Sequence, residues 1–129
     1  MTYAIKILSV FVSGKRSKVW RLPPSLNSRM HWAVKGKIKK QFQSDIFYQL
    51  KALKVPKCQK IKVTLINYTC YPMDRDNLFS CFKPLVDAIV LANIVPDDAE
   101  EFVDSYVKNV KVDHIIEQKV IMEIEPIIP

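Results

Sequence analysis

The chain has 129 residues, 49% hydrophobic and 26% charged, a composition that excludes a disordered or fibrous protein and predicts one domain over residues 1–129. Residues 1–18 lack the pattern of a secretory signal, and no apolar run approaches the ~20 residues that span a bilayer, so we expect a cytoplasmic protein without a membrane partner. Three widely spaced cysteines encode neither a disulfide framework nor a thiolate zinc site.

The net charge of +7 divides unevenly along the chain. Residues 1–62 hold 15 Lys/Arg and one acid, a net charge of +14, whereas residues 63–129 hold 5 Lys/Arg and 12 acids, a net charge of −7. This division is typical of a polyanion binder with a localised acidic site, although two solvated faces would produce the same pattern.

The first predicted elements are extended. Residues 3–12 predict a buried strand, residues 13–18 a basic turn, and residues 19–22 a second short strand or extended segment. The Pro23-Pro24 pair then forces a loop, because proline removes a donor and restricts its predecessor.

A helix follows this loop. Apolar residues at helical spacing predict it over 44–54, with the pattern extending back through Phe42 and Ile38, and Pro56 marks its end. The basic run 35–40 precedes or opens this helix.

The second half predicts a strand, a helix and a hairpin. Residues 61–71 alternate as a strand does, residues 77–92 form an apolar central helix that Asp76 caps and Pro84 kinks, and residues 95–98 form a turn. Residues 105–112 and 118–125 predict two strands that pair as a hairpin. The order β(β)-α-β-α-β-β predicts an α+β (mixed α/β) fold, a small sheet with two main helices packed on it.

Polar residues occur in one register of the apolar helix, at Asp76, Ser80, Lys83 and Asp87. At about 100° per residue these positions return to within about 40° of one another. The stripe is either a solvent face with an ordinary Lys83–Asp87 pair or the wall of a site, and its narrowness favours a site.

Two acidic pairs flank this helix. Asp74 and Asp76 stand where the predicted strand gives way to the helix, so their carboxylates can hold a hard cation. Asp97 and Asp98 lie in the turn after the helix, where an acidic pair alone is more often a solvated cap than a ligand.

Taken together, these motifs resemble those of the RusA-type Holliday-junction resolvases. Asp74-x-Asp76-Asn77-Leu78, Lys83-x-x-x-Asp87-Ala88 and Asp97-Asp98 are similar to the family's DxDN box, Lys-x-x-x-Asp-Ala helix and terminal Asp-Asp, and residues 23–27 are similar to its P-S-x-N loop. The lysine stands three residues further from the DxDN box than in the commoner family pattern. Since three residues are nearly one turn, Lys83 keeps its face and moves about 5 Å along the axis.

The resemblance implies a homodimeric endonuclease that resolves four-way DNA junctions in recombination and repair, with Mg²⁺ as cofactor and Mn²⁺ as its substitute. A phage or prophage origin would fit such a nuclease. The resemblance also implies that Asp74, Asp76 and Asp98 bind the metal, with Asp97 beside them, that Lys83 is the catalytic or phosphate-contacting base, and that Asp87 is an additional acid. Because grouped carboxylates repel one another without metal or Lys83, we expect some raised carboxylate pKa values.

The basic first half predicts phosphate contacts whose affinity falls steeply with salt. The predicted DNA-binding residues are Lys15, Arg16, Lys18, Arg21, Asn27, Arg29, Lys35, Lys37, Lys39 and Lys40. Two other hypotheses fit the same residues. One is a non-catalytic basic nucleic-acid-binding protein whose acids are caps and surface groups, and the other is a nuclease of the same fold that acts on other branched or single-stranded DNA.

Overall fold

The structure is a computed structural model that describes residues 2–13, 16–25 and 29–127; for 9–13 and 16–19 only the backbone is described. Its elements in chain order are β1 (Tyr3–Ile7), β2 (Ser9–Ser13), β3 (Arg16–Trp20), α1 (Trp32–Leu53), β4 (Lys60–Thr69), α2 (Arg75–Ser80), α3 (Lys83–Leu91), β5 (Val103–Lys111), the 3-10 turn η1 (Ile115–Glu117) and β6 (Lys119–Ile127). This is the predicted α+β fold.

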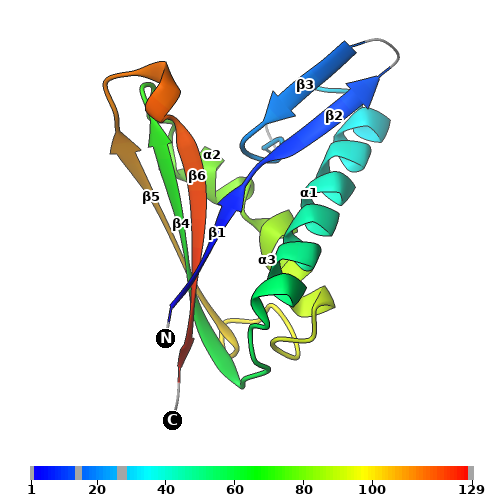
Figure 1. The fold of residues 1–129 in the computed structure, drawn as a ribbon, viewed down its shortest axis with the longest axis vertical. Coiled ribbons are helices and arrows are strands. Elements are labelled where there is room, and N and C mark those ends of the chain that lie inside the picture. Colours follow the sequence, from blue (N-terminus) through cyan, green and yellow to red (C-terminus); the bar gives the residue numbers. More distant parts are fainter. Residues whose placement is uncertain (1, 14–15, 26–28, 128–129) are drawn as a thin grey trace.

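A mixed four-stranded sheet, in the order β1-β6-β4-β5, forms one layer of the fold. β4 runs parallel to β5 and antiparallel to β6, and β6 is antiparallel to β1. The helices lie to one side of this sheet, and the β2–β3 hairpin lies over the N-terminal end of α1 (Figure 1). The core therefore lies between one face of the sheet and the α1–α3 pair.

The predicted pairing of the last two strands is wrong. β5 and β6 do not form a hairpin but flank β4, with Ile61 opposite Val103 in the parallel pair. The connection 112–118 crosses the end of β4, where the Gln118 side-chain oxygen accepts hydrogen bonds from the Thr69 hydroxyl and the Cys70 backbone N–H. β4 and β6 are the two inner strands of the sheet, and both bury their inward apolar residues, an order that periodicity alone does not predict.

The N-terminal strand is also divided differently from the prediction. The expected strand 3–12 breaks at Leu8, and β2 leaves the main sheet to pair with β3. The predicted basic turn 13–18 contributes residues to both strands of this hairpin, with Ser13 opposite Arg16. Antiparallel pairing satisfies backbone groups that a single extended strand at the sheet edge would leave open.

Helix α1 extends the predicted helix toward its N-terminus and contains the basic run 35–40. A buried stripe of one residue per turn holds it to the core: Ile38, Phe42, Ile46 and Leu50. The His31 imidazole caps its start by accepting a hydrogen bond from the Ala33 N–H at 3.2 Å. Its end is closed by Lys54 in the left-handed conformation, two residues before Pro56.

The predicted central helix is two helices, α2 and α3, which meet at Cys81 and Phe82. Pro84 causes the break because it has no N–H for the Ser80 carbonyl, and a first turn is where a proline fits. Asp74, and not Asp76, takes the N-cap position of α2, without a side-chain capping bond.

The remaining predictions concern cysteines and membranes. All three cysteines are free thiols, as expected. In the part of the chain that the structure describes, no helix combines the length and hydropathy needed to cross a bilayer.

Candidate active site

The polar stripe of the second helical region lines one pocket of about 580 Å³. The break between α2 and α3 keeps Asp76, Ser80, Lys83 and Asp87 along the same wall, and the loop after α3 adds Asp98. The other lining residues come from α1, α2, α3, the α2–α3 junction and β5: Lys39, Gln43, Phe79, Phe82, Pro84, Val86 and Ser105. The residues of the stripe therefore lie along the wall of one pocket.

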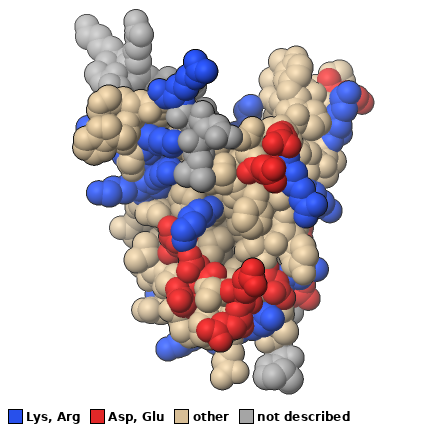
Figure 2. Space-filling model, turned by 180° about the vertical axis from the view of Figure 1, so that it is seen from behind, with Lys and Arg blue, Asp and Glu red and all other residues tan. Residues whose placement is uncertain are grey.

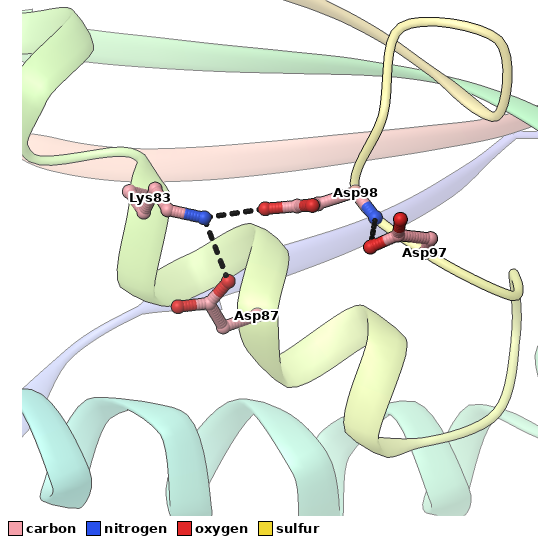
Figure 3. Close-up of polar contacts among 4 residues, drawn as sticks. All are labelled: Lys83, Asp87, Asp97 and Asp98. Atoms are coloured by element: carbon pink, nitrogen blue, oxygen red, sulfur yellow. Dashed lines mark hydrogen bonds and ion pairs between the residues drawn. The ribbon is translucent and has the colours of Figure 1, made fainter.

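Lys83 joins two of these carboxylates (Figure 3). It is the first residue of α3, and its Nζ lies 3.3 Å from Asp87 Oδ1 one turn further along the helix. The same Nζ donates a short hydrogen bond to Asp98 Oδ2, and the two side chains form an ion pair. The ammonium therefore lies between an acid of the helix and an acid of the following loop.

The loop holds Asp98 in place through its own neighbour. Asp97 Oδ1 accepts a hydrogen bond from the Asp98 backbone N–H at 2.7 Å, so the Asp97 side chain folds back on the turn (Figure 3). The Ala99 carbonyl accepts from the N–H groups of Phe102 and Val103 and joins the loop to the start of β5. Asp97 thus orients the loop, while Asp98 faces Lys83.

The ion pair decides the electrostatics of this group. The hydrogen bond from Lys83 lowers the pKa of the Asp98 carboxyl below its ordinary value of 3.8, helped by the bond with Asp97. The same hydrogen bond raises the pKa of Lys83 above 10.5. For Asp98 the expectation of a raised carboxylate pKa is therefore wrong, because the Lys83 ammonium neutralises the repulsion.

Two predicted site residues lie outside the pocket. Asp74 precedes the first residue of α2, and its carboxylate is not part of the pocket lining. Asp97 is engaged in the loop hydrogen bond and does not line the pocket either. Of the three residues predicted to bind the metal, the pocket brings together Asp76 and Asp98.

The carboxylates that line the pocket are ligands of the kind that a hard cation prefers. Asp76, Asp87 and Asp98 offer only carboxylate oxygens, and Mg²⁺ is usually held by one or two carboxylates, waters and substrate phosphates. Among residues 2–13, 16–25 and 29–127, no three His, Cys, Asp or Glu side chains are close enough to hold a metal ion together. Asp76 and Asp98 therefore line the same pocket, but among the described residues they are not part of a closed protein cage for a metal ion.

The predicted DNA-binding residues divide into three groups. Arg21, Arg29, Lys37 and Lys40 are exposed, whereas Lys35 and Lys39 are half-buried. The side chains of Arg16 and Lys18 lie outside the description, as do Lys15 and Asn27 entirely. Figure 2 shows Lys and Arg side chains gathered over the N-terminal half of α1, above the acidic side chains on the same face. Basic and acidic side chains thus share this face of the molecule.

Three pocket residues were not singled out from the sequence. Phe79 falls within the predicted apolar helix 77–92, but 51% of its surface is exposed. Gln43 lies one turn after Lys39, a spacing that would have placed it beside that lysine. Ser105 faces the pocket from β5, and this position depends on the parallel pairing of β5 with β4, which the sequence did not reveal.

Comparisons with protein-family models and with curated proteins give no significant match to the chain.

Proposed function

We propose that the protein is a Mg²⁺-dependent, structure-specific DNA endonuclease that resolves four-way junctions by paired phosphodiester hydrolysis. The observation that supports this most is the convergence of Asp76, Lys83, Asp87 and Asp98 on one pocket beside the basic helix α1. These residues belong to α2, α3 and the following loop, and their motifs are those that resemble the RusA-type resolvases.

The basic helix supplies the binding step. Lysines of α1 neutralise phosphates on both sides of the cut, which brings the DNA backbone to the acidic pocket without reading bases. The acidic wall alone would repel that backbone. Lys83 reduces this repulsion because its ammonium offsets the charge of Asp87 and Asp98.

Lys83 has a second role once DNA is bound. Its side chain is well exposed, so it can turn from Asp98 toward a phosphate oxygen while Asp87, in the same helix, keeps it in place. Asp98 then becomes free to act as a ligand or a base together with Asp76. Asp76 and Asp98 would hold Mg²⁺, which would supply Lewis-acid stabilisation of the charge on the phosphoryl oxygens.

A homodimer belongs to the same proposal. Resolution of a four-way junction requires two symmetric cuts, and a two-fold protein on a two-fold substrate places one pocket on each strand. Each protomer then makes one incision.

The test is cleavage of a labelled synthetic four-way junction beside a linear duplex of the same sequence, with Mg²⁺ or with EDTA. Wild type is compared with Asp76→Asn and with Asp113→Asn, a matched exposed acid in the β5–β6 connection. We expect paired nicks near the crossover in wild type and in Asp113→Asn, and none in Asp76→Asn or EDTA.

Other outcomes identify the other hypotheses. Junction binding without metal-dependent cutting, unchanged by Asp76→Asn, would mean a non-catalytic nucleic-acid-binding protein. Metal-dependent cutting of flaps or single strands in preference to the four-way junction would mean a nuclease with another branched substrate.

A further inference from the structure

The pocket has a second half that the proposed reaction does not use. Its lining is apolar at Phe79, Phe82, Pro84 and Val86, and α1 closes it with polar side chains. With about 580 Å³ in total, the pocket lies within the range of roughly 300–1,000 Å³ typical of small-molecule sites and exceeds what a phosphate group needs. The unused half has room for a larger part of the substrate.

Phe79 gives this half an open aromatic surface. It lies in the last turn of α2, with 51% of its surface exposed, while Phe82 in the following turn is buried. The two ring centroids are 6.2 Å apart at an angle of 44°, so the buried ring supports the exposed one from one side. An exposed ring in a pocket next to a basic helix is suited to stack on a nucleobase.

Lys39 and Gln43 line the same pocket from α1. They are four residues apart and so lie on the same side of the helix, and both are half-buried in the pocket lining. Phe79 and Phe82 of the α2–α3 region line the same pocket as Lys39, so this ammonium lies across the pocket from them. No carboxylate of the described residues forms an ion pair with Lys39.

We propose that this half of the pocket binds one nucleotide of the DNA strand, next to the phosphate that is cut. The base stacks on Phe79, the Gln43 amide forms hydrogen bonds with the edge of the base, and Lys39 contacts the flanking phosphate. The charge and shape of the lining identify the occupant. The flat Phe79 ring suits a base, the Lys39 ammonium suits a phosphate, and the acidic wall beyond them suits the reaction. This inference rests on the proposed nuclease function.

Gln43 makes this subsite a source of sequence preference. A side-chain amide donates and accepts at once, so it distinguishes bases by their donor and acceptor patterns, whereas a lysine–phosphate contact does not. We therefore expect cleavage to depend on the identity of one nucleotide beside the cut.

Three pairs of variants test the subsite on four-way junctions. Phe79→Leu removes the ring and is matched by Tyr48→Leu, an exposed aromatic of α1 outside the pocket. Lys39→Ala is matched by Lys57→Ala, which removes the same charge at an exposed position outside both α1 and the pocket lining. Gln43→Ala is compared with wild type on junctions in which the nucleotides beside the cut are varied.

We expect Phe79→Leu to lower kcat/KM roughly ten-fold or more, the range that loss of one base–aromatic stack produces. Tyr48→Leu should stay within about two-fold of wild type. Lys39→Ala should lose more activity than Lys57→Ala, and Gln43→Ala should cut junctions with less dependence on the nucleotide beside the cut. A second readout is 2-aminopurine placed beside the cut site, in complexes inactivated by Asp76→Asn. Its fluorescence should be quenched on binding, and Phe79→Leu should remove the quenching.

The outcomes separate this inference from the function on which it rests. If wild type cuts junctions and each variant equals its control, with unchanged 2-aminopurine fluorescence, the nucleotide subsite is wrong and the endonuclease proposal stands. If wild type does not cut DNA under any of these conditions, both are wrong.

Discussion

Lys83 and Asp87 of α3 face the pocket only if Leu85, which lies between them in the sequence, packs on the side of the helix that faces the core. Leu85 has no exposed surface, so Leu85→Ala removes a completely packed side chain. Replacements of this kind cost about 2–5 kcal/mol, and we take about 3 kcal/mol. With an unfolding entropy of about 2.1 cal/mol/K per residue, a chain of this length loses about 11 °C in Tm.

Leu91→Ala is the matched control, since Leu91 lies in the same helix with 61% of its surface exposed. It should change Tm by no more than about 2 °C, because surface substitutions stay within about 0.5 kcal/mol. Thermal unfolding followed by calorimetry and by circular dichroism measures both. Equal shifts for the two variants would refute the orientation of α3, and with it the placement of Lys83 and Asp87.

Three further predictions concern charge and reactivity. Because the pKa of Asp98 is lowered and that of Lys83 is raised, their pair should stabilise the fold between about pH 5 and pH 10. The Tm difference between wild type and Asp98→Asn should shrink as pH falls below 3.8 or rises above 10.5, and a difference that is independent of pH would contradict this. Cys81, buried and with its pKa raised to about 11, should resist iodoacetamide at pH 8 in the folded protein and react after unfolding, as peptide mass spectrometry would show; rapid labelling of the native protein would contradict it. Replacing both Lys37 and Lys40 with Gln should reduce the slope of log K against log salt for duplex DNA by about 1.8. Fluorescence anisotropy measures this slope, and an unchanged slope would mean that these α1 lysines do not contact the DNA.

Local patterns predicted much of the fold. The apolar spacing in α1 placed Phe42 and Ile46 on its buried face, and alternation in β4 placed Ile61 and Val63 inside. These patterns depend on interactions within one element and the core, which sequence periodicity records. Strand order depends on which edges meet after collapse, so the parallel pairing of β5 with β4 was not accessible from the pattern of either strand.

The sequence predicted the pocket residues that share one helical face and missed those that come together only through contacts between elements. The stripe through Asp76 and Asp87 lines the pocket because Pro84 breaks the helix without changing the face of either part. The hydrogen bond of Asp97 within its own loop depends on the geometry of a turn. The position of Gln43 in the pocket depends on how α1 packs on the other helices. Neither follows from residue spacing.

The central claim is that Asp76 of α2 and Asp98 of the loop act in one catalytic site. A double-mutant cycle of Asp76→Asn and Asp98→Asn, with kcat measured on a four-way junction in Mg²⁺, tests it most directly. Residues that act as a unit are strongly non-additive, so we predict that each single variant loses nearly all of the activity and that the double variant is no slower than either. Single variants that retain wild-type rates, or losses that multiply in the double variant, would contradict a shared site.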